Sequence, residues 1–222
     1  MSIFVFDIPK SAIPCVKTGT SIDEALKIME YYKITHLPIV NNEDYLGLIS
    51  EDDLLCNEDT MQPIGGLRLT VQGAEVEENA NIFDIMNSIY QNNLSLVPIV
   101  DEKKRFVGVV LALSVLHAIS DLLSVNNPGG IIILEMNVVD YSLTQISNIV
   151  EANESSIITS FIHTVPNTTL MRLVLKINNP DLGSVLQAFE RYDYNVIASF
   201  GQDMMDDIIK DRYEMLMRYL NL

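Results

Sequence analysis

The chain has 222 residues, of which 48% are hydrophobic and 20% charged, an ordinary balance for a globular protein of one large or two modest domains. Its 30 acidic residues outnumber the 14 basic ones and give a formal net charge of −16. A surface this negative repels phosphate backbones and anionic lipids, so we expect neither nucleic-acid binding nor membrane binding.

Cysteine and histidine are too few and too scattered for a disulfide framework or a zinc site. Cys15 and Cys56 form no CxxC pair, which favours two free thiols in a reducing compartment. The three histidines lack the spacing of zinc ligands, and they are His36, His117 and His163. We therefore expect no structural metal.

Neither a signal peptide nor a membrane span is expected. The amino terminus, MSIFVFDIPK, carries Asp7 and lacks the basic start and long apolar core of a signal peptide. The most apolar stretch, residues 106–119, is shorter than the roughly 18 to 20 residues that a membrane span needs. These features predict a soluble, cytoplasmic protein.

One unit of about 60 residues is written twice between Ser21 and Ile119. The sequence LPIV around Pro38 corresponds to VPIV around Pro98, 60 positions later. Further along the chain, Gly47 corresponds to Gly108 at an offset of 61 positions, because the loop at 101–105 has one extra residue. The repeat predicts two copies of one fold.

Each copy predicts the element order αββα. A polar N-cap, Ser21 or Asn81, precedes apolar residues at helical spacing. A β-branched strand that contains Pro, a polar turn and a second strand follow, and another helix starts near Ser50 or Leu111. Each copy would expose one apolar sheet face, so we expect the two sheets to pack together and leave two related clefts.

The pattern SIxxAxxxM, IxHLPIV and YLGLISxxDLL in the first copy resembles a CBS domain. The two copies together resemble a CBS tandem, or Bateman module, over about residues 9–122. The resemblance implies an α/β (α+β) fold and a regulatory role. It also implies an adenosine-containing ligand of the AMP, ATP or S-adenosylmethionine class in a cleft between the copies.

The same resemblance places the ligand where the second strand of the first copy meets its second helix. The Ser50 hydroxyl would bond phosphate or ribose, the Asp53 carboxylate would accept the ribose hydroxyls, and free helix N–H groups would face a phosphate. The apolar groups expected around the adenine are Ile13, Ile49 and the backbone of Leu37 and Pro38. Ser50 is also a natural N-cap and Asp53 belongs to an acidic first turn, so the residues alone leave both interpretations open.

The second copy departs from this pattern. Leu111 stands at the place of Ser50, and Ser114 stands at the place of Asp53. Glu75 adds negative charge where a phosphate would lie. We therefore expect at most one nucleotide per chain, held by the first copy.

The second half predicts a separate domain after the linker NNPGG at 126–130. Apolar strands alternate with two helices, the first capped by Ser142 and the second starting after Pro180-Asp181; the expected strands are 131–138, 156–165, 170–177 and 195–200. This βαββαβ order is ferredoxin-like and resembles an ACT domain. The ACT resemblance implies amino-acid binding at the loop 140–142, or side-by-side pairing of sheets from two chains.

The predicted boundaries are 1–125 for the CBS pair, with repeats at about 9–60 and 70–122, then 131–200 for the ACT-like domain. A final segment, 203–222, carries an apolar stripe at helical spacing, which predicts an amphipathic C-terminal helix that packs against its own chain or a partner.

This order of domains resembles the acetoin utilization (AcuB) family, whose presumed role is regulatory. The sequence has no GxSxG, Walker or HExxH motif, so we expect no catalytic residue and no required cofactor or metal. We predict a homodimeric, non-catalytic sensor of an adenine nucleotide that signals to a regulated protein the sequence does not identify. The alternatives are a ligand-free dimerisation scaffold and an amino-acid sensor acting through the ACT-like domain.

Overall fold

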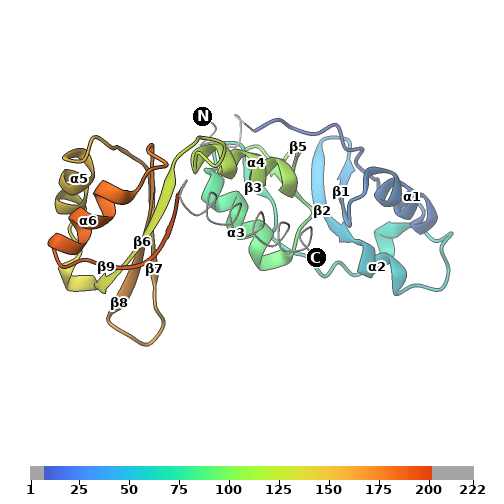
Figure 1. Cartoon of the computed structure of the whole chain (residues 1–222). Helices are drawn as coiled ribbons and strands as arrows, with labels where there is room; N and C mark the ends of the chain where they lie inside the picture. Colours follow the sequence, from blue (N-terminus) through green and yellow to red (C-terminus); the bar gives the residue numbers. More distant parts are fainter. Residues whose placement is uncertain (1–7, 202–222) are drawn as a thin grey trace, which may run out of the picture. The chain divides into compact units, whose positions relative to one another are not determined.

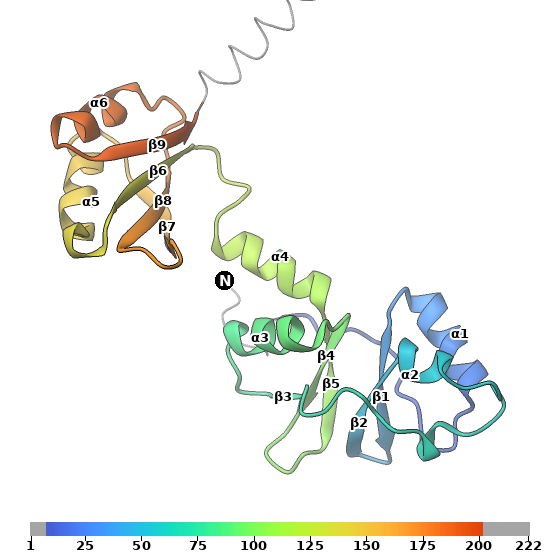
Figure 2. The ribbon, with the colours of Figure 1, turned by 90° about the horizontal axis from the view of Figure 1, so that it is seen from below.

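A computed structural model of the chain describes residues 8–201, and the chain divides into two compact units between Leu122 and Leu123. Each unit has its own hydrophobic core. Figures 1 and 2 show the two units from perpendicular directions. No helix among the described residues is long and apolar enough to cross a membrane. The helix predicted at 203–222 lies outside the described residues.

The first repeat begins with a capped helix followed by a hairpin and a short helix: α1 (Ile22–Tyr32), β1 (His36–Asn41), β2 (Asp44–Ser50) and α2 (Glu51–Leu55). The Ser21 hydroxyl accepts a hydrogen bond from the Glu24 N–H at 3.2 Å, so the predicted N-cap is confirmed. Strands β1 and β2 are antiparallel and place Leu37 opposite Ile49.

The second repeat adds a short leading strand and has a longer last helix, and is otherwise in the same order: β3 (Val76–Glu77), α3 (Ile82–Asn92), β4 (Leu96–Val100), β5 (Phe106–Leu111) and α4 (Ala112–Leu122). The Asn81 side chain caps α3 as predicted. A single 3-10 turn, Ile64–Gly66, lies between the repeats. Both hairpins have a register shift at equivalent places, after Ile39 and after Ile99, so even the irregularity is repeated.

The leading segment of each repeat, the residues before its first long helix, contacts the other repeat as well as its own. The Ser11 N–H donates to the Val109 carbonyl of the second repeat at 3.0 Å, and the Thr70 N–H donates to the Asp53 carboxylate of the first at 3.4 Å. Buried residues of both hairpins and both long helices belong to one core. This confirms that the two copies pack against each other.

The second unit has the predicted βαββαβ order: β6 (Gly130–Asn137), α5 (Leu143–Glu151), β7 (Ile157–Thr164), β8 (Leu170–Ile177), α6 (Gly183–Arg191) and β9 (Asn195–Phe200). All neighbouring strands are antiparallel, in the order β7-β8-β6-β9, which is the ferredoxin-like topology. Helices α5 and α6 lie on the same side of this sheet (Figure 1).

A steric constraint explains why the linker has a glycine at position 129. Gly129 has φ +155°, and a Cβ there would lie 2.0 Å from the carbonyl oxygen of Ile177. Any side chain at this position would push β6 away from β8, because the clashing atom is backbone. The linker signal in the sequence therefore marks the point where the sheet of the second unit begins.

Candidate functional site

Ser50 and Asp53 lie together at the junction of β2 and α2, and each is only 7% exposed. The Asp53 N–H donates to the Ser50 Oγ at 3.1 Å, and the Ser50 N–H donates to the Asp53 Oδ2 at 3.1 Å. This reciprocal pair is a capping box, which satisfies two backbone donors at the start of the helix. The capping interpretation of these two residues is therefore realised in the structure.

The expectation of free helix N–H groups facing a phosphate is wrong for two of the first three residues of α2. The Glu51 N–H donates to the Thr35 carbonyl at 2.8 Å, and the Asp53 N–H is held by Ser50. The helix has only five residues, so its dipole is also small. The start of α2 therefore offers a ligand phosphate fewer N–H donors than the sequence predicted.

The predicted apolar residues are part of the core. Leu37 and Ile49 have no exposed surface, Pro38 is buried, and Ile13 is half-buried against the same core. The structure brings Ser50 and Asp53 together, but it leaves the side chains of Leu37 and Ile49 without a face open to solvent.

A polar cavity of about 320 Å³ lies beside Ser50. Both repeats and the segment between them line it: Thr35, His36, Ser50, Glu51, Asp52, Thr70, Val71, Asn92 and Asn93. Ser50 is the one member of the predicted ligand set on this wall. A molecule in this cavity would contact both repeats at once.

His36 joins the two repeats at this cavity. His36 is 7% exposed, and its Nδ1 lies 3.0 Å from the Thr35 Oγ1 and 3.2 Å from the Ser95 Oγ. Burial lowers the pKa of His36 below its usual 6.5, while the charges of Asp53 and Asp52 act in the opposite direction.

Sequence reasoning missed Thr35 and Ser95, which meet where the two repeats face each other. The Thr35 N–H donates to the Ser95 Oγ at 3.1 Å. The two residues stand 60 positions apart, the same offset as the repeated prolines. The signal was present in the sequence, because equivalent residues of a two-fold repeat come together at its axis.

A second cavity, of about 560 Å³, shares Val71 with the first and carries cationic side chains. Arg68 and Lys104 line it together with Glu75, whose Oε1 lies 3.4 Å from the Lys104 Nζ. Arg68 is exposed and stands three residues before Val71. Arg68 is thus a cation on the wall of the cavity that adjoins the polar cavity.

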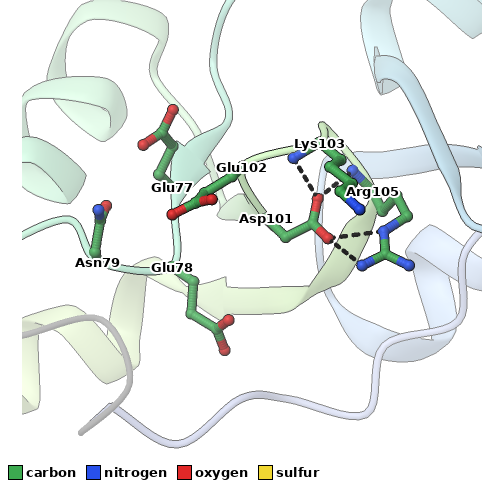
Figure 3. A pocket seen from close by; sticks show the side chains of 7 residues that line it. All are labelled: Glu77, Glu78, Asn79, Asp101, Glu102, Lys103 and Arg105. Atoms are coloured by element: carbon green, nitrogen blue, oxygen red, sulfur yellow. Dashed lines mark hydrogen bonds and ion pairs between the residues drawn. The ribbon is translucent and has the colours of Figure 1, made fainter.

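A third cavity, of about 490 Å³, is too acidic for a nucleotide. Its lining comprises Glu77, Glu78, Asn79, Asp101, Glu102, Lys103 and Arg105. Figure 3 shows the Asp101 carboxylate occupied by the backbone N–H groups of Lys103 and Arg105 and by the Arg105 guanidinium, at 2.8–2.9 Å. Hydrogen bonds from the Arg105 backbone lower the pKa of Asp101. This group shapes the β4–β5 turn.

The second repeat keeps the backbone of the site without its polar side chains. The Ala112 N–H donates to the Ser95 carbonyl at 3.0 Å, as the Glu51 N–H does to Thr35 in the first repeat. Leu111 and Ser114 replace the capping pair, and Leu111 has no polar side-chain atom to act as an acceptor. The two copies therefore share this backbone hydrogen bond and differ in the side chains around it.

Other candidate groups give no site. Among residues 8–201 no three His, Cys, Asp or Glu side chains gather in a way that could hold a metal ion. Cys15 and Cys56 are free thiols, and burial raises the pKa of Cys15. In the second unit, residues 138–140 form a 3-10 turn, so amino-acid binding at the loop 140–142 stays a prediction.

Comparison with known proteins identifies both repeats. Residues 5–57 and 74–121 each match the family described as CBS domain. Inosine-5'-monophosphate dehydrogenase from Methanocaldococcus jannaschii is 30% identical over 96 residues, which is 43% of this chain and 19% of that protein. The chain thus matches about a fifth of the length of this curated relative.

Solved structures are similar to about half of this chain. A CBS domain pair/ACT domain protein from Thermotoga maritima is 21% identical with a TM-score of 0.50, covering 55% of this chain and 99% of that one. A putative acetoin utilization protein (AcuB) from Vibrio cholerae is 22% identical with a TM-score of 0.48, covering 57% of this chain and 96% of that one. Three further structures of this kind are described as complexes with AMP or ATP.

Proposed function

We propose that this chain, which carries a tandem pair of CBS domains, is a non-catalytic regulatory sensor that binds an adenosine-containing ligand in the polar cavity beside Ser50. The observation that carries the proposal is the lining of this cavity, which comes from both repeats. Its volume of about 320 Å³ falls at the lower end of small-molecule sites. A single nucleoside or mononucleotide is the ligand size that this volume suits.

The proposed ribose contacts are Ser50 and Asp53. Both hydrogen bonds that the Asp53 carboxylate accepts reach Oδ2. A carboxylate has two acceptor oxygens, so Oδ1 keeps capacity for a ribose hydroxyl while the capping box stays intact. The proposed apolar surroundings of the base are Leu37, Pro38, Ile49 and Ile13. Leu37 follows His36 and Ile49 precedes Ser50 in the chain, and His36 and Ser50 line the cavity.

The proposed partner of a ligand phosphate is Arg68. Two of the three N–H groups at the start of α2, those of Glu51 and Asp53, are already engaged, and Arg68 lines the adjoining cavity that shares Val71. A guanidinium matches phosphate oxygens in a bidentate geometry. We therefore expect Arg68→Ala to weaken AMP binding by about tenfold and to leave adenosine binding unchanged.

The mechanism that follows is a population shift. A ligand that contacts Thr35 and His36 from one repeat and Asn92 and Asn93 from the other favours one arrangement of the two repeats over others. A homodimer would transmit that preference to the regulated protein.

The test is thermal denaturation and calorimetric titration with adenosine, AMP, ATP and S-adenosylmethionine. A ligand at 100 times its Kd should stabilise the protein by about 2.7 kcal/mol. Thr70→Phe should abolish this stabilisation, because the larger side chain fills the cavity while the backbone N–H of residue 70 still reaches Asp53. Thr60→Phe, an exposed threonine outside the cavity lining, is the matched control.

One observation favours a second function, a ligand-free scaffold. Ser50 and Asp53 already satisfy each other through the capping box, so neither needs a ligand. If none of the four compounds stabilises the protein at millimolar concentration, the result would favour the scaffold function and contradict the sensor function.

A further inference from the structure

The sheet of the second unit has one face on the core and one face that its helices do not cover. Along β6 and β8 the residues alternate, and Leu134 and Leu173, opposite each other, have no exposed surface. Their neighbours point to the other side. We call this other side the open face and define it by Ile131, Ile133, Glu135, Phe161, Arg172 and Val174.

The open face is apolar at its centre. Phe161, Val174 and Ile133 lie opposite one another across β7, β8 and β6, and Phe161 is 48% exposed. An antiparallel sheet with a solvated face normally carries polar residues there. The linker occupies only one end of the face, where the Lys176 ammonium donates to the carbonyls of Ser124 and Val125. An apolar row on an uncovered sheet face makes this face a candidate interaction surface.

One pair of opposite charges on the open face can complement a second copy of itself. Arg172 on β8 and Glu135 on β6 are register partners, and the Arg172 Nε lies 3.0 Å from the Glu135 Oε2. The sheet order β7-β8-β6-β9 puts these two strands at its centre. A two-fold axis parallel to the strands and between β8 and β6 therefore sets each β8 against the partner's β6.

This symmetry pairs opposite charges and apolar groups at the same time. Arg172 would face Glu135 of the partner subunit, and Val174 would face Ile133 of the partner subunit. Each contact occurs twice, because a two-fold interface uses the same patch on both chains. Side-by-side pairing of edge strands would instead leave the apolar row in water.

We propose that a second copy of this chain covers the open face, with its sheet packed face to face around that axis. This dimer interface is independent of the ligand cavity, so its failure would leave the sensor proposal unchanged. The chain's own segment 203–222 is the competing occupant, and the experiments below separate the two.

Charge reversal in the full-length chain is the first test, read by sedimentation. Glu135→Arg or Arg172→Glu alone sets like charges against each other and should raise the dissociation constant of the dimer at least about tenfold. Mixing the two variants should restore association, because one chain then carries two cations at these positions and its partner carries two carboxylates. Glu151→Arg, the same charge change on the exposed end of α5, should leave association unchanged.

Cross-linking is the second test, and it gives an answer even when the CBS pair also holds two chains together. In a chain with Cys15→Ser and Cys56→Ser, a tagged Ile133→Cys variant is mixed with a Val174→Cys variant and treated with a short bis-maleimide. A mixed cross-linked dimer, lost when Glu135→Arg is added to both chains, supports the interface. Protected thiols in a monomer assign the face to the chain's own segment, and readily alkylated thiols without cross-links leave it uncovered; either result overturns the proposal.

Discussion

The imidazole of His36 is held between the two repeats by the hydroxyls of Thr35 and Ser95. Burial lowers its pKa, so the folded protein keeps this ring neutral at a pH where the unfolded chain would protonate it. The contribution of His36 to the free energy of unfolding is therefore complete above the unfolded pKa of about 6.5. It is lost as the pH falls below that value toward the folded pKa.

We predict that His36→Asn flattens the pH dependence of stability between about pH 7.5 and pH 5.5, the range around the unfolded pKa of histidine. Asparagine keeps a hydrogen-bonding group near the position of Nδ1 but has no proton to gain. Urea denaturation of both proteins at the two pH values measures the effect. An equal loss of stability on acidification in both proteins would show that other groups carry the dependence.

The roles and contacts of single residues could be predicted from the sequence only in part. The sequence left Ser50 and Asp53 open between a cap and a ligand site, and the structure builds the cap. The third contact to this pair, the Thr70 N–H, comes from 17 positions away. No local sequence pattern predicts such a contact, because it depends on how the segment that leads into the second repeat crosses the first repeat.

Among the elements, Gly47 and Gly108 occupy equivalent positions in the two repeats, so their surroundings can be compared directly. Gly47 has φ +151°, and a Cβ there would lie 2.6 Å from the Leu69 Cδ1 in the crossing segment. At Gly108 the nearest contact would be the Lys10 Cδ at 3.3 Å, at the flexible end of a long side chain. The same position in the repeat therefore has different tolerance in its two copies.

We predict that Gly47→Ala destabilises the protein by about 1–3 kcal/mol, from backbone strain and displacement of Leu69. Gly108→Ala should cost less than about 1 kcal/mol, because Lys10 can move aside. Chemical denaturation of the two variants in parallel checks the difference. Equal costs would mean that the crossing of the leading segments does not set the requirement for glycine.

Most elements of both units were predictable because caps and periodicity are local. The length of α2 was not, since the equivalent helix α4 runs for eleven residues and α2 for five. The Asn57 side chain donates to the carbonyls of Asp53 and Leu54 and ends the helix. A helix of five residues also has a small dipole, which makes its start a weaker partner for a phosphate than the sequence predicted.

At the scale of the whole molecule, the two units have separate cores. The core of the CBS pair runs from Ile8 to Ala118, and the core of the ferredoxin-like unit runs from Ile132 to Phe189. The sequence indicated this division through the NNPGG linker, but it did not show the apolar open face of the second sheet. That face depends on strand order, which brings together residues distant in the chain, such as Ile133 and Val174.

We predict two calorimetric transitions, because cores that share no residues can unfold separately. Ile132→Ala, which empties a fully buried site in β6, should lower the stability of one transition by about 2–5 kcal/mol and leave the other in place. An adenosine ligand should raise only the transition that this variant leaves unchanged, since the cavity beside Ser50 lies in the CBS pair. A single transition that moves as a whole under both changes would instead mean that the two units unfold as one cooperative body.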